Sequence, residues 1–348
     1  MSQDQVTGEK TNKEVLPDRI KQAVLKETFD IAIEEVDMPE VQDHEALVKV
    51  MAVGVCGSDV HYYEHGKIGN FIVEEPLVLG HECAGEVVKV GENVTHLKPG
   101  DRVAIEPGVP CGHCAHCKNG KYNLCPDVEF MATPPIDGAF TQYVSHAADF
   151  LYPIPDTLSY EQASLIEPFS VGLHACKRVN LQPGSSIVIM GMGPVGLMAV
   201  VAAKAFGATN IIVTDLEKNR LDAAQKLGAT HAINIKEEDP VQKVLELTNG
   251  EGASYAFETA GNPTALQSAL ESLRADGKLA IVGLPQQDVI GLNIPFIANR
   301  EIDIFGVFRY SNTYPMGIEI LASNQSGVDA LFTDFYSLDE TKEALEQA

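Results

Sequence analysis

Residues 186–207 read SIVIMGMGPVGLMAVVAAKAFG, and this stretch decides the fold. The apolar run SIVIM predicts a buried strand, and PVGLMAVVAAKAFG predicts the helix that follows it. Gly191, Gly193 and Gly196 between them form a G-x-G-x-x-G pattern, which is weak evidence alone but stronger between a strand and a helix. The glycines permit a tight turn, a close backbone approach to a pyrophosphate, and close helix–strand packing. The free N–H groups of the helix N-terminus favour a dinucleotide phosphate there.

Asp215 ends the next apolar run, NIIVTD, nineteen residues beyond Gly196. A carboxylate at this point accepts hydrogen bonds from both ribose hydroxyls and repels a 2′-phosphate, so NAD is favoured over NADP. Arg220 follows closely and could instead stack on adenine or contact a phosphate. The alternative is that the glycines only make a turn and Asp215 only ends a strand. The surrounding pattern favours the cofactor.

The chain divides into two regions of different pattern. From about Leu165 onward, strand-like and helix-like segments alternate, which predicts βαβ units on a parallel sheet covered on both faces. Residues 20–152 instead contain short strand-like runs separated by turns, which predicts a β-rich, barrel-like module. We therefore expect an α/β protein of about two domains. Residues 1–18 are polar and are expected to form a loose arm.

The composition excludes several classes of partner. With 25 basic and 49 acidic residues the formal net charge is −24, and such a field repels nucleic acid and anionic lipid. No apolar run reaches the ~20 residues of a membrane span, and the N-terminus lacks the apolar core of a signal peptide. We expect a cytoplasmic location. The last residues, TKEALEQA, have a helical pattern without a following strand or cap, so we expect a missing C-terminal piece.

Four of the seven cysteines lie within fifteen residues, too close together for a simple set of disulfides. Their thiolates suffice to close a tetrahedral zinc site with Zn–S bonds of ~2.3 Å, which leaves no position for a substrate. Such a site is structural, and its expected task is to fold a lobe that has little core of its own. The alternative is four reduced thiols in a loop. The four residues are Cys111, Cys114, Cys117 and Cys125.

A second set of ligand types is dispersed: Cys56 in GVCGSD, His81 and Glu82 in LGHECAGEV, and Glu167 in LIEPFSVG. Each is unremarkable alone, because buried cysteines and paired glutamates are common in cores. Together they offer one sulfur, one nitrogen and two carboxylates, with room for water or an alcohol. That open arrangement is what a catalytic zinc requires.

The sequence closely resembles the zinc-dependent medium-chain dehydrogenases, and within them the bacterial sorbitol dehydrogenase group, over essentially all of residues 20–348. Two of the stretches that carry the resemblance, HYYEHGKIGNF and VFRYSNTYP, are narrower markers than the general pattern around GHE-x-x-G. The others are LGHECAGEV, KPGDRVAIEPG, ATPPIDGAF, LIEPFSVGLHA and GMGPVG. The resemblance implies a GroES-like catalytic domain in residues 1–165 with a structural-zinc lobe at about 107–127, a Rossmann NAD-binding domain in residues 166–308, and a return segment in residues 309–348.

The resemblance also assigns roles at the catalytic metal. Cys56, His81 and Glu82 are similar to zinc ligands, whereas Glu167 either ligates the zinc or holds its water. Which of the two glutamates binds directly stays open at this point. Asp59 resembles the carboxylate that orients the zinc-bound histidine.

Further roles follow for substrate and cofactor. Ser58 matches the hydroxyl that hydrogen-bonds the reacting alcohol oxygen. The residues implied to contact the polyol are Tyr62, Glu167, Arg309 and Tyr310. The residues implied to line NAD, besides those of the glycine loop, Asp215 and Arg220, are Val195, Val282, Gly283, Leu284, Val307, Phe308 and Arg309.

The implied activity is oxidation of a secondary alcohol of sorbitol or xylitol to the ketose, with hydride transfer to NAD and two zinc ions per chain. The resemblance also suggests a homotetramer. One alternative is a dehydrogenase for another substrate, such as arabitol, galactitol, a butanediol or threonine. Another is a non-catalytic NAD-binding zinc protein, which is disfavoured because every proposed ligand and the serine are present.

Overall fold

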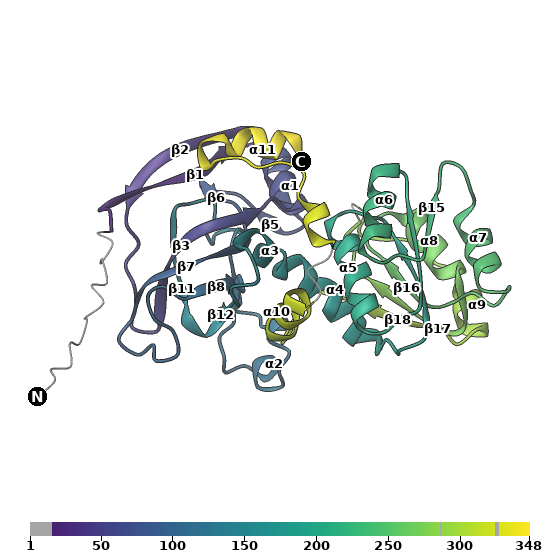
Figure 1. The fold of residues 1–348 in the computed structure, drawn as a ribbon. Helices are drawn as coiled ribbons and strands as arrows, with labels where there is room; N and C mark the ends of the chain where they lie inside the picture. Colours follow the sequence, from purple (N-terminus) through teal and green to yellow (C-terminus); the bar gives the residue numbers. More distant parts are fainter. Residues whose placement is uncertain (1–15, 286, 324–326) are drawn as a thin grey trace, which may run out of the picture.

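Two sheets of different kinds divide the chain into two lobes that lie side by side (Figure 1). The computed structural model describes residues 16–285, 287–323 and 327–348. The first lobe is built from antiparallel strands and the second from parallel strands with helices on both sides. This is the α/β architecture predicted from the change of pattern along the sequence.

The first lobe centres on a five-stranded antiparallel sheet. In sheet order its strands are β11 (Tyr143–Ala147), β3 (Glu45–Gly54), β7 (Glu82–Val90), β8 (Arg102–Ile105) and β12 (Leu151–Pro153). A three-stranded sheet lies beside it, made of β2 (Asp30–Asp37), β1 (Arg19–Glu27) and β6 (Leu77–Val78). Two short pairs complete the strands: β4 (Lys67–Ile68) with β5 (Phe71–Ile72), and β9 (Gly108–Val109) with β10 (Glu129–Phe130). Val48, Val87 and Ile105 from neighbouring strands fill the core of this lobe.

Short helices connect the strands of the first lobe. They are α1 (Gly57–His65), α2 (Ala115–Lys118), η1 (Tyr122–Leu124), η2 (Ala148–Phe150) and α3 (Tyr160–Ser164). The helix α1 begins directly after β3 and is capped at its start by Asp59, whose side chain accepts a hydrogen bond from the backbone N–H of Cys56 at 3.0 Å. This cap fixes where the chain turns out of the sheet.

The second lobe contains a six-stranded parallel sheet. In sheet order its strands are β15 (His231–Asn234), β14 (Asn210–Asp215), β13 (Ser186–Met190), β16 (Ala253–Glu258), β17 (Leu273–Ile281) and β18 (Asp303–Gly306). Its helices are α5 (Pro194–Ala205), α6 (Lys218–Leu227), α7 (Pro240–Leu247), α8 (Pro263–Glu271) and α9 (Ile294–Asn299). The strand order reverses between β13 and β16, which is where ligands bind in sheets of this kind.

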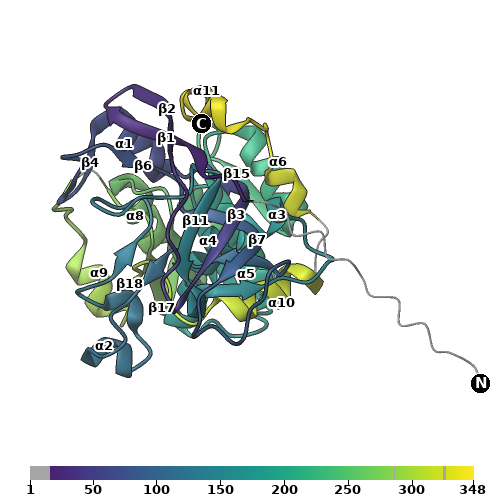
Figure 2. The same ribbon diagram turned by 90° about the vertical axis from the view of Figure 1, so that its left-hand side faces the viewer.

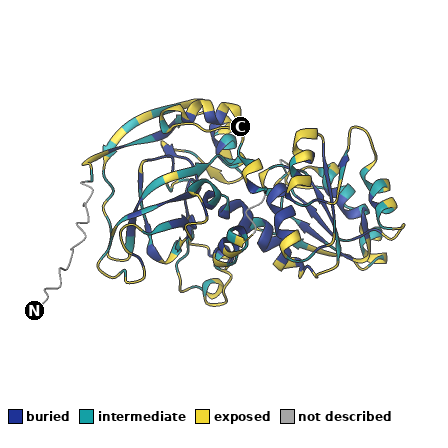
Figure 3. Ribbon diagram, in the orientation of Figure 1, coloured by how far each residue is buried: buried dark blue, intermediate teal, exposed yellow. Residues whose placement is uncertain are grey.

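Both faces of the parallel sheet are covered, as Figure 3 shows by its dark blue strands. Alternate residues of β13 belong to different cores: Ile187 and Ile189 to one, Val188 and Met190 to the other. An unbroken apolar run is therefore what this strand needs. Across the described ranges, no helix combines the length and apolarity needed to cross a bilayer.

One long helix, α4 (Ile166–Val179), joins the lobes and is buried along most of its length. It packs against α5 at Gly172, where a Cβ atom would lie 3.0 Å from the Cα of Ala199. After β18 the chain returns, and α10 (Tyr314–Ser323) also packs against α4. The elements η3 (Val328–Leu331), η4 (Leu338–Glu340) and α11 (Thr341–Gln347) follow. Figures 1 and 2 both place α11 on the first lobe, where it contacts α1 and β2.

Candidate active site

The pairing register between β3 and β7 brings together residues that are distant in the sequence. Gly54, at the end of β3, is the partner of Glu82, at the start of β7. Cys56 therefore comes to lie beside His81. Gly54 permits this approach, because a Cβ atom in its place would collide with the carboxylate of Glu82.

Cys56, His81 and Glu82 offer a sulfur, an imidazole nitrogen and a carboxylate oxygen that lie within 4.8 Å of one another. Asp59 lies behind the histidine, with its Oδ1 atom 3.6 Å from His81 Nδ1. The same oxygen accepts a hydrogen bond from the backbone N–H of Gly80 at 2.9 Å. A carboxylate in this position orients the ring and leaves its other nitrogen for a metal. The donor set fits a catalytic zinc with an open position.

Glu167 enters from the first turn of α4 but is not part of this group of three, as far as the described residues show. Its Oε1 atom accepts a hydrogen bond from the buried Tyr310 hydroxyl at 2.8 Å. Burial, followed by the nearby charge of Glu167, raises the pKa of Glu82 to about 8. Burial raises the pKa of Glu167 as well. Two adjacent buried carboxylates disfavour a second negative charge, and a bound Zn²⁺ would reverse that preference.

Ser58 and Tyr62 lie four residues apart on α1 and so share one face of the helix. Ser58 is half-buried, and Tyr62 is buried. Burial raises the pKa of Tyr62 to about 12, which keeps its hydroxyl protonated at neutral pH. These two predicted residues therefore offer neutral hydroxyl groups close in the sequence to Cys56, a candidate metal ligand.

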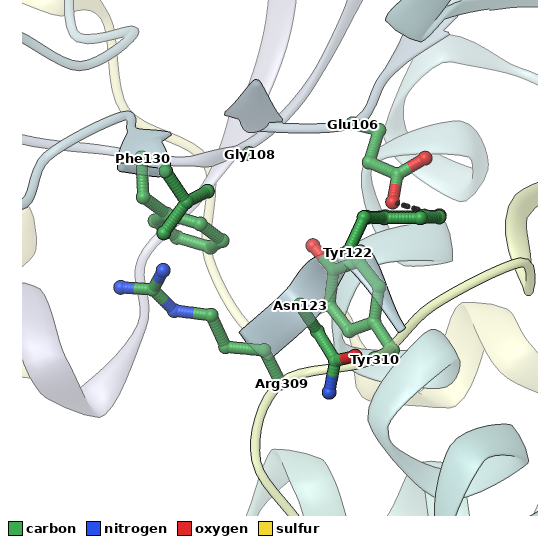
Figure 4. A pocket seen from close by; sticks show the side chains of 8 residues that line it. Glu106, Gly108, Tyr122, Asn123, Phe130, Arg309 and Tyr310 are labelled. Atoms are coloured by element: carbon green, nitrogen blue, oxygen red, sulfur yellow. Dashed lines mark hydrogen bonds between the residues drawn. The ribbon is translucent and has the colours of Figure 1, made fainter. Parts of the chain in front are cut away.

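Arg309 and Tyr310 lie in the turn after β18, residues 308–312, which we call the recognition turn. The guanidinium of Arg309 lies 3.7 Å from the ring centroid of Phe130, and Figure 4 shows it extending toward that ring. The Phe130 ring in turn lies 5.8 Å from the ring of His81, centroid to centroid. The structure thus places a cation one ring away from the catalytic cluster.

The four cysteines between residues 111 and 125 converge as predicted, with sulfur atoms within 4.8 Å of one another. The backbone N–H groups of Cys111, Cys114 and Cys117 donate to the sulfurs of Cys125, Cys111 and Cys114, each at 3.4 Å. Such bonds stabilise thiolates, and the backbone N–H of Cys117 accordingly lowers the pKa of Cys114. The set fits a closed tetrahedral zinc. We call residues 111–125 the cysteine lobe.

The glycine loop connects β13 to α5 as predicted. Gly191 has a φ of 98°, which favours glycine, and a Cβ atom at Gly196 would collide with the carbonyl oxygen of Gly191. At Gly193, the N-cap of α5, a Cβ atom would meet nothing within 4 Å. Two glycines therefore serve the local packing, and the third leaves open space at the helix N-terminus.

Asp215 lies at the end of β14, next to the glycine loop. Its Oδ2 atom accepts a hydrogen bond from the backbone N–H of Met192 at 2.6 Å, and its Oδ1 atom accepts one from the backbone N–H of Glu217 at 2.8 Å. The carboxylate thus holds the glycine loop in place, and the ribose contact predicted for it stays a prediction. Arg220 is exposed in the first turns of α6.

The other positions predicted to line the cofactor lie around the strands β17 and β18 and the loop. Gly283 is closely packed, since a Cβ atom there would collide with the backbone nitrogen of Gly261. The half-buried members are Val195, Val282, Gly283 and Val307, and the exposed ones are Leu284 and Phe308. Exposed apolar side chains beyond the carboxyl ends of parallel strands fit a site that an apolar ring system covers.

Sequence reasoning missed a buried carboxylate at the edge of the site, Glu106. It accepts hydrogen bonds from the hydroxyls of Tyr122 at 2.7 Å and Tyr152 at 2.9 Å. Burial raises the pKa of Glu106 to about 7. The signal was an acidic residue directly after the apolar strand DRVAI. Figure 4 shows Glu106 and Tyr122 across a small pocket from Arg309.

Comparison with known proteins decides the family. The zinc-binding dehydrogenase model matches residues 194–323, and the model of the alcohol dehydrogenase GroES-like domain matches residues 42–156. A sorbitol dehydrogenase of Bacillus subtilis is 62% identical over 333 residues, which make up 96% of this chain and 94% of that protein. The chain belongs to the zinc-binding dehydrogenases.

This dehydrogenase also resembles solved structures along nearly its full length. An Escherichia coli oxidoreductase described as of unknown specificity matches with a TM-score of 0.90 and 42% identity, covering 94% of this chain and 95% of that one. A protein of Sinorhizobium meliloti described as a zinc-binding dehydrogenase, with NADP bound, matches with a TM-score of 0.88 and 28% identity, covering 94% and 95%. The predicted family, fold, zinc dependence and nicotinamide cofactor are confirmed, and the protein is an oxidoreductase acting on CH–OH groups.

The contrast between Gly193 and Gly196 yields a prediction. Gly196→Ala forces the loop apart, so its free energy of unfolding should fall by ~1–3 kcal/mol. Gly193→Ala should keep its stability within ~0.5 kcal/mol but lose about tenfold in NADH affinity, because its methyl group projects where the pyrophosphate would lie. Denaturant titration and NADH fluorescence titration measure the two effects. Unaltered NADH binding by Gly193→Ala would place the pyrophosphate elsewhere.

Proposed function

We propose that this chain is a zinc-dependent, NAD-linked polyol dehydrogenase that oxidises a secondary alcohol of sorbitol or xylitol to the ketone. The observation that carries the proposal is the convergence of Cys56, His81 and Glu82 beside side chains that suit a polyhydroxylated substrate, Tyr62 and Arg309. The name of the Bacillus subtilis relative supports the same substrate class.

The proposal assigns the catalytic zinc to Cys56, His81 and Glu82, because their ligand atoms converge. Glu167, which is hydrogen-bonded to Tyr310, is assigned a place beside the ion rather than among these ligands. When bound, the zinc would polarise the alcohol oxygen and the nicotinamide would accept the hydride from the carbon that bears it. Asp59 would hold the imidazole in the orientation that the metal needs.

The remaining proposed roles belong to side chains around the alcohol. Ser58 accepts a hydrogen bond from the reacting hydroxyl and passes its proton toward solvent. Tyr62 and Arg309 bind hydroxyl groups further along the substrate, and so fix which carbon faces the nicotinamide. In the cysteine lobe a second zinc would organise the fold without contacting substrate, because four thiolates complete its coordination.

The proposal also covers the domain division, the oligomeric state and the location of the protein. The domain division at residues 165 and 308 follows the arrangement of sheets and helix α4. A homotetramer is supported by exposed apolar side chains: that of Ile304 lies on the edge strand β18, and that of Val289 lies between β17 and α9. A cytoplasmic location is supported by the reduced state of the cysteines that zinc ligation requires.

The preference for NAD over NADP is attributed to the charge of Asp215. Asp215→Asn keeps an acceptor for the Met192 N–H but removes the negative charge, so repulsion of a 2′-phosphate should weaken. We expect the ratio of kcat/KM with NADP to kcat/KM with NAD to rise about tenfold. Steady-state assays with both cofactors give this ratio. If it stays unchanged, the ribose contact has been misplaced.

A panel of alcohols tests the proposed function directly. Sorbitol, xylitol, arabitol, galactitol, 2,3-butanediol and threonine are offered with NAD, with and without a zinc chelator, and NADH absorbance is followed. We expect sorbitol or xylitol to give the highest kcat/KM, and chelation to abolish turnover. Cys56→Ser should lose turnover while NADH binding is retained, because the thiolate serves the metal and not the nucleotide. A higher kcat/KM for arabitol, galactitol, 2,3-butanediol or threonine, or chelator-resistant turnover, would overturn the proposal.

A further inference from the structure

Side-chain amides join the cysteine lobe to the recognition turn. The buried Asn123 side chain donates a hydrogen bond to the backbone carbonyl of Phe308 at 2.8 Å. From the other side, the Asn312 side chain donates to the backbone carbonyl of Gly120 at 2.8 Å. The backbone N–H of Asn312 adds a third bond, to the Tyr122 hydroxyl at 2.7 Å, so that both ends of the turn are held against the cysteine lobe although the two segments are far apart in the sequence.

The recognition turn needs such restraint because its backbone is disfavoured. Arg309 has a φ of 48° and Asn312 a φ of 55°, both in the left-handed region. Asparagine tolerates this conformation, but a long side chain such as arginine rarely adopts it. A conformation of this kind persists only where neighbouring groups hold it. The amide groups of Asn123 and Asn312 are placed to do so.

The recognition turn also fixes the positions of two side chains of the proposed substrate site. Asn123, Arg309 and Tyr310 line the same small pocket (Figure 4). Arg309 lies over the ring of Phe130, and the Tyr310 hydroxyl donates to Glu167 at 2.8 Å. A shift of the turn would therefore move the guanidinium relative to a substrate, while Cys56, His81 and Glu82, at and just beyond the paired ends of β3 and β7, would stay in place.

We propose that Asn123 is a positioning residue through which the cysteine lobe sets the preference for long polyols over simple secondary alcohols. It acts through the backbone of Phe308, which fixes the direction of the adjacent Arg309. The inference rests on the proposed function, in which Arg309 binds hydroxyl groups remote from the reacting carbon. An alcohol without such hydroxyl groups makes no contact with Arg309, so its kcat/KM should not change when the recognition turn becomes more mobile.

The test compares Asn123→Ala with a matched control, Asn119→Ala. Asn119 lies in the same lobe, but its amide donates to the Ala115 carbonyl within the lobe at 2.8 Å. In Asn123→Ala we expect the KM for sorbitol to rise about tenfold, with kcat for sorbitol and kcat/KM for 2-butanol held within about twofold. Asn119→Ala should change none of these. Zinc content, measured on the full-length holoenzyme, should equal that of the unaltered protein in both.

A second variant, Asn312→Gly, tests the inference independently in case Asn123→Ala fails to fold. Glycine keeps the positive φ and removes only the amide that bonds Gly120, so the KM for sorbitol should rise in the same selective way. Equal losses on sorbitol and 2-butanol, loss of zinc from Asn123→Ala, or an unchanged sorbitol KM would overturn the inference. An unaltered enzyme that oxidises 2-butanol but no polyol would instead overturn the proposed function, and the inference with it.

Discussion

The antiparallel register of β3 and β7 is the constraint on which the catalytic centre depends. It sets Gly54 opposite Glu82 and thereby brings a cysteine, a histidine and a glutamate from two segments that are distant in the sequence to one point. A slip of one residue would turn alternate side chains to the other face of the sheet and disperse the ligands. Asp59 stabilises this arrangement, because its carboxylate accepts hydrogen bonds from the backbone N–H groups of Cys56 and of Gly80, which precedes His81.

Burial makes it unfavourable for these converging side chains to carry negative charge unless a cation binds between them. Two carboxylates and a thiol lie in an interior where each raised pKa reports the cost of removing a charge from water. A divalent cation offsets that cost and becomes the largest local charge. The same interior places Arg309 one aromatic ring away from His81, so that the proposed metal site and the proposed site for substrate hydroxyl groups lie close together. The glycine loop follows β13, at the switch point of the parallel sheet.

Local patterns predicted much of this from the sequence. The glycine loop and the cysteine lobe depend on spacing within a few residues, and both formed as expected. The dispersed ligands could be grouped by chemistry, but their meeting depends on strand register, which only family resemblance supplied. The tie between Asn123 and Phe308 was missed, because no local pattern links residues so far apart. The hydrogen bond from the backbone N–H of Met192 to Asp215 was also missed, because no sequence motif predicts it.

In the proposed site, Cys56, His81 and Glu82 hold one zinc ion. Anomalous X-ray scattering at the zinc absorption edge, from crystals of the zinc-loaded protein, can locate this ion. We expect one peak among the four cysteines of the cysteine lobe and a second at roughly 2.0–2.3 Å from the sulfur of Cys56, the ring of His81 and the carboxylate of Glu82. A protein that turns over alcohol yet shows no peak at this second position would contradict this assignment.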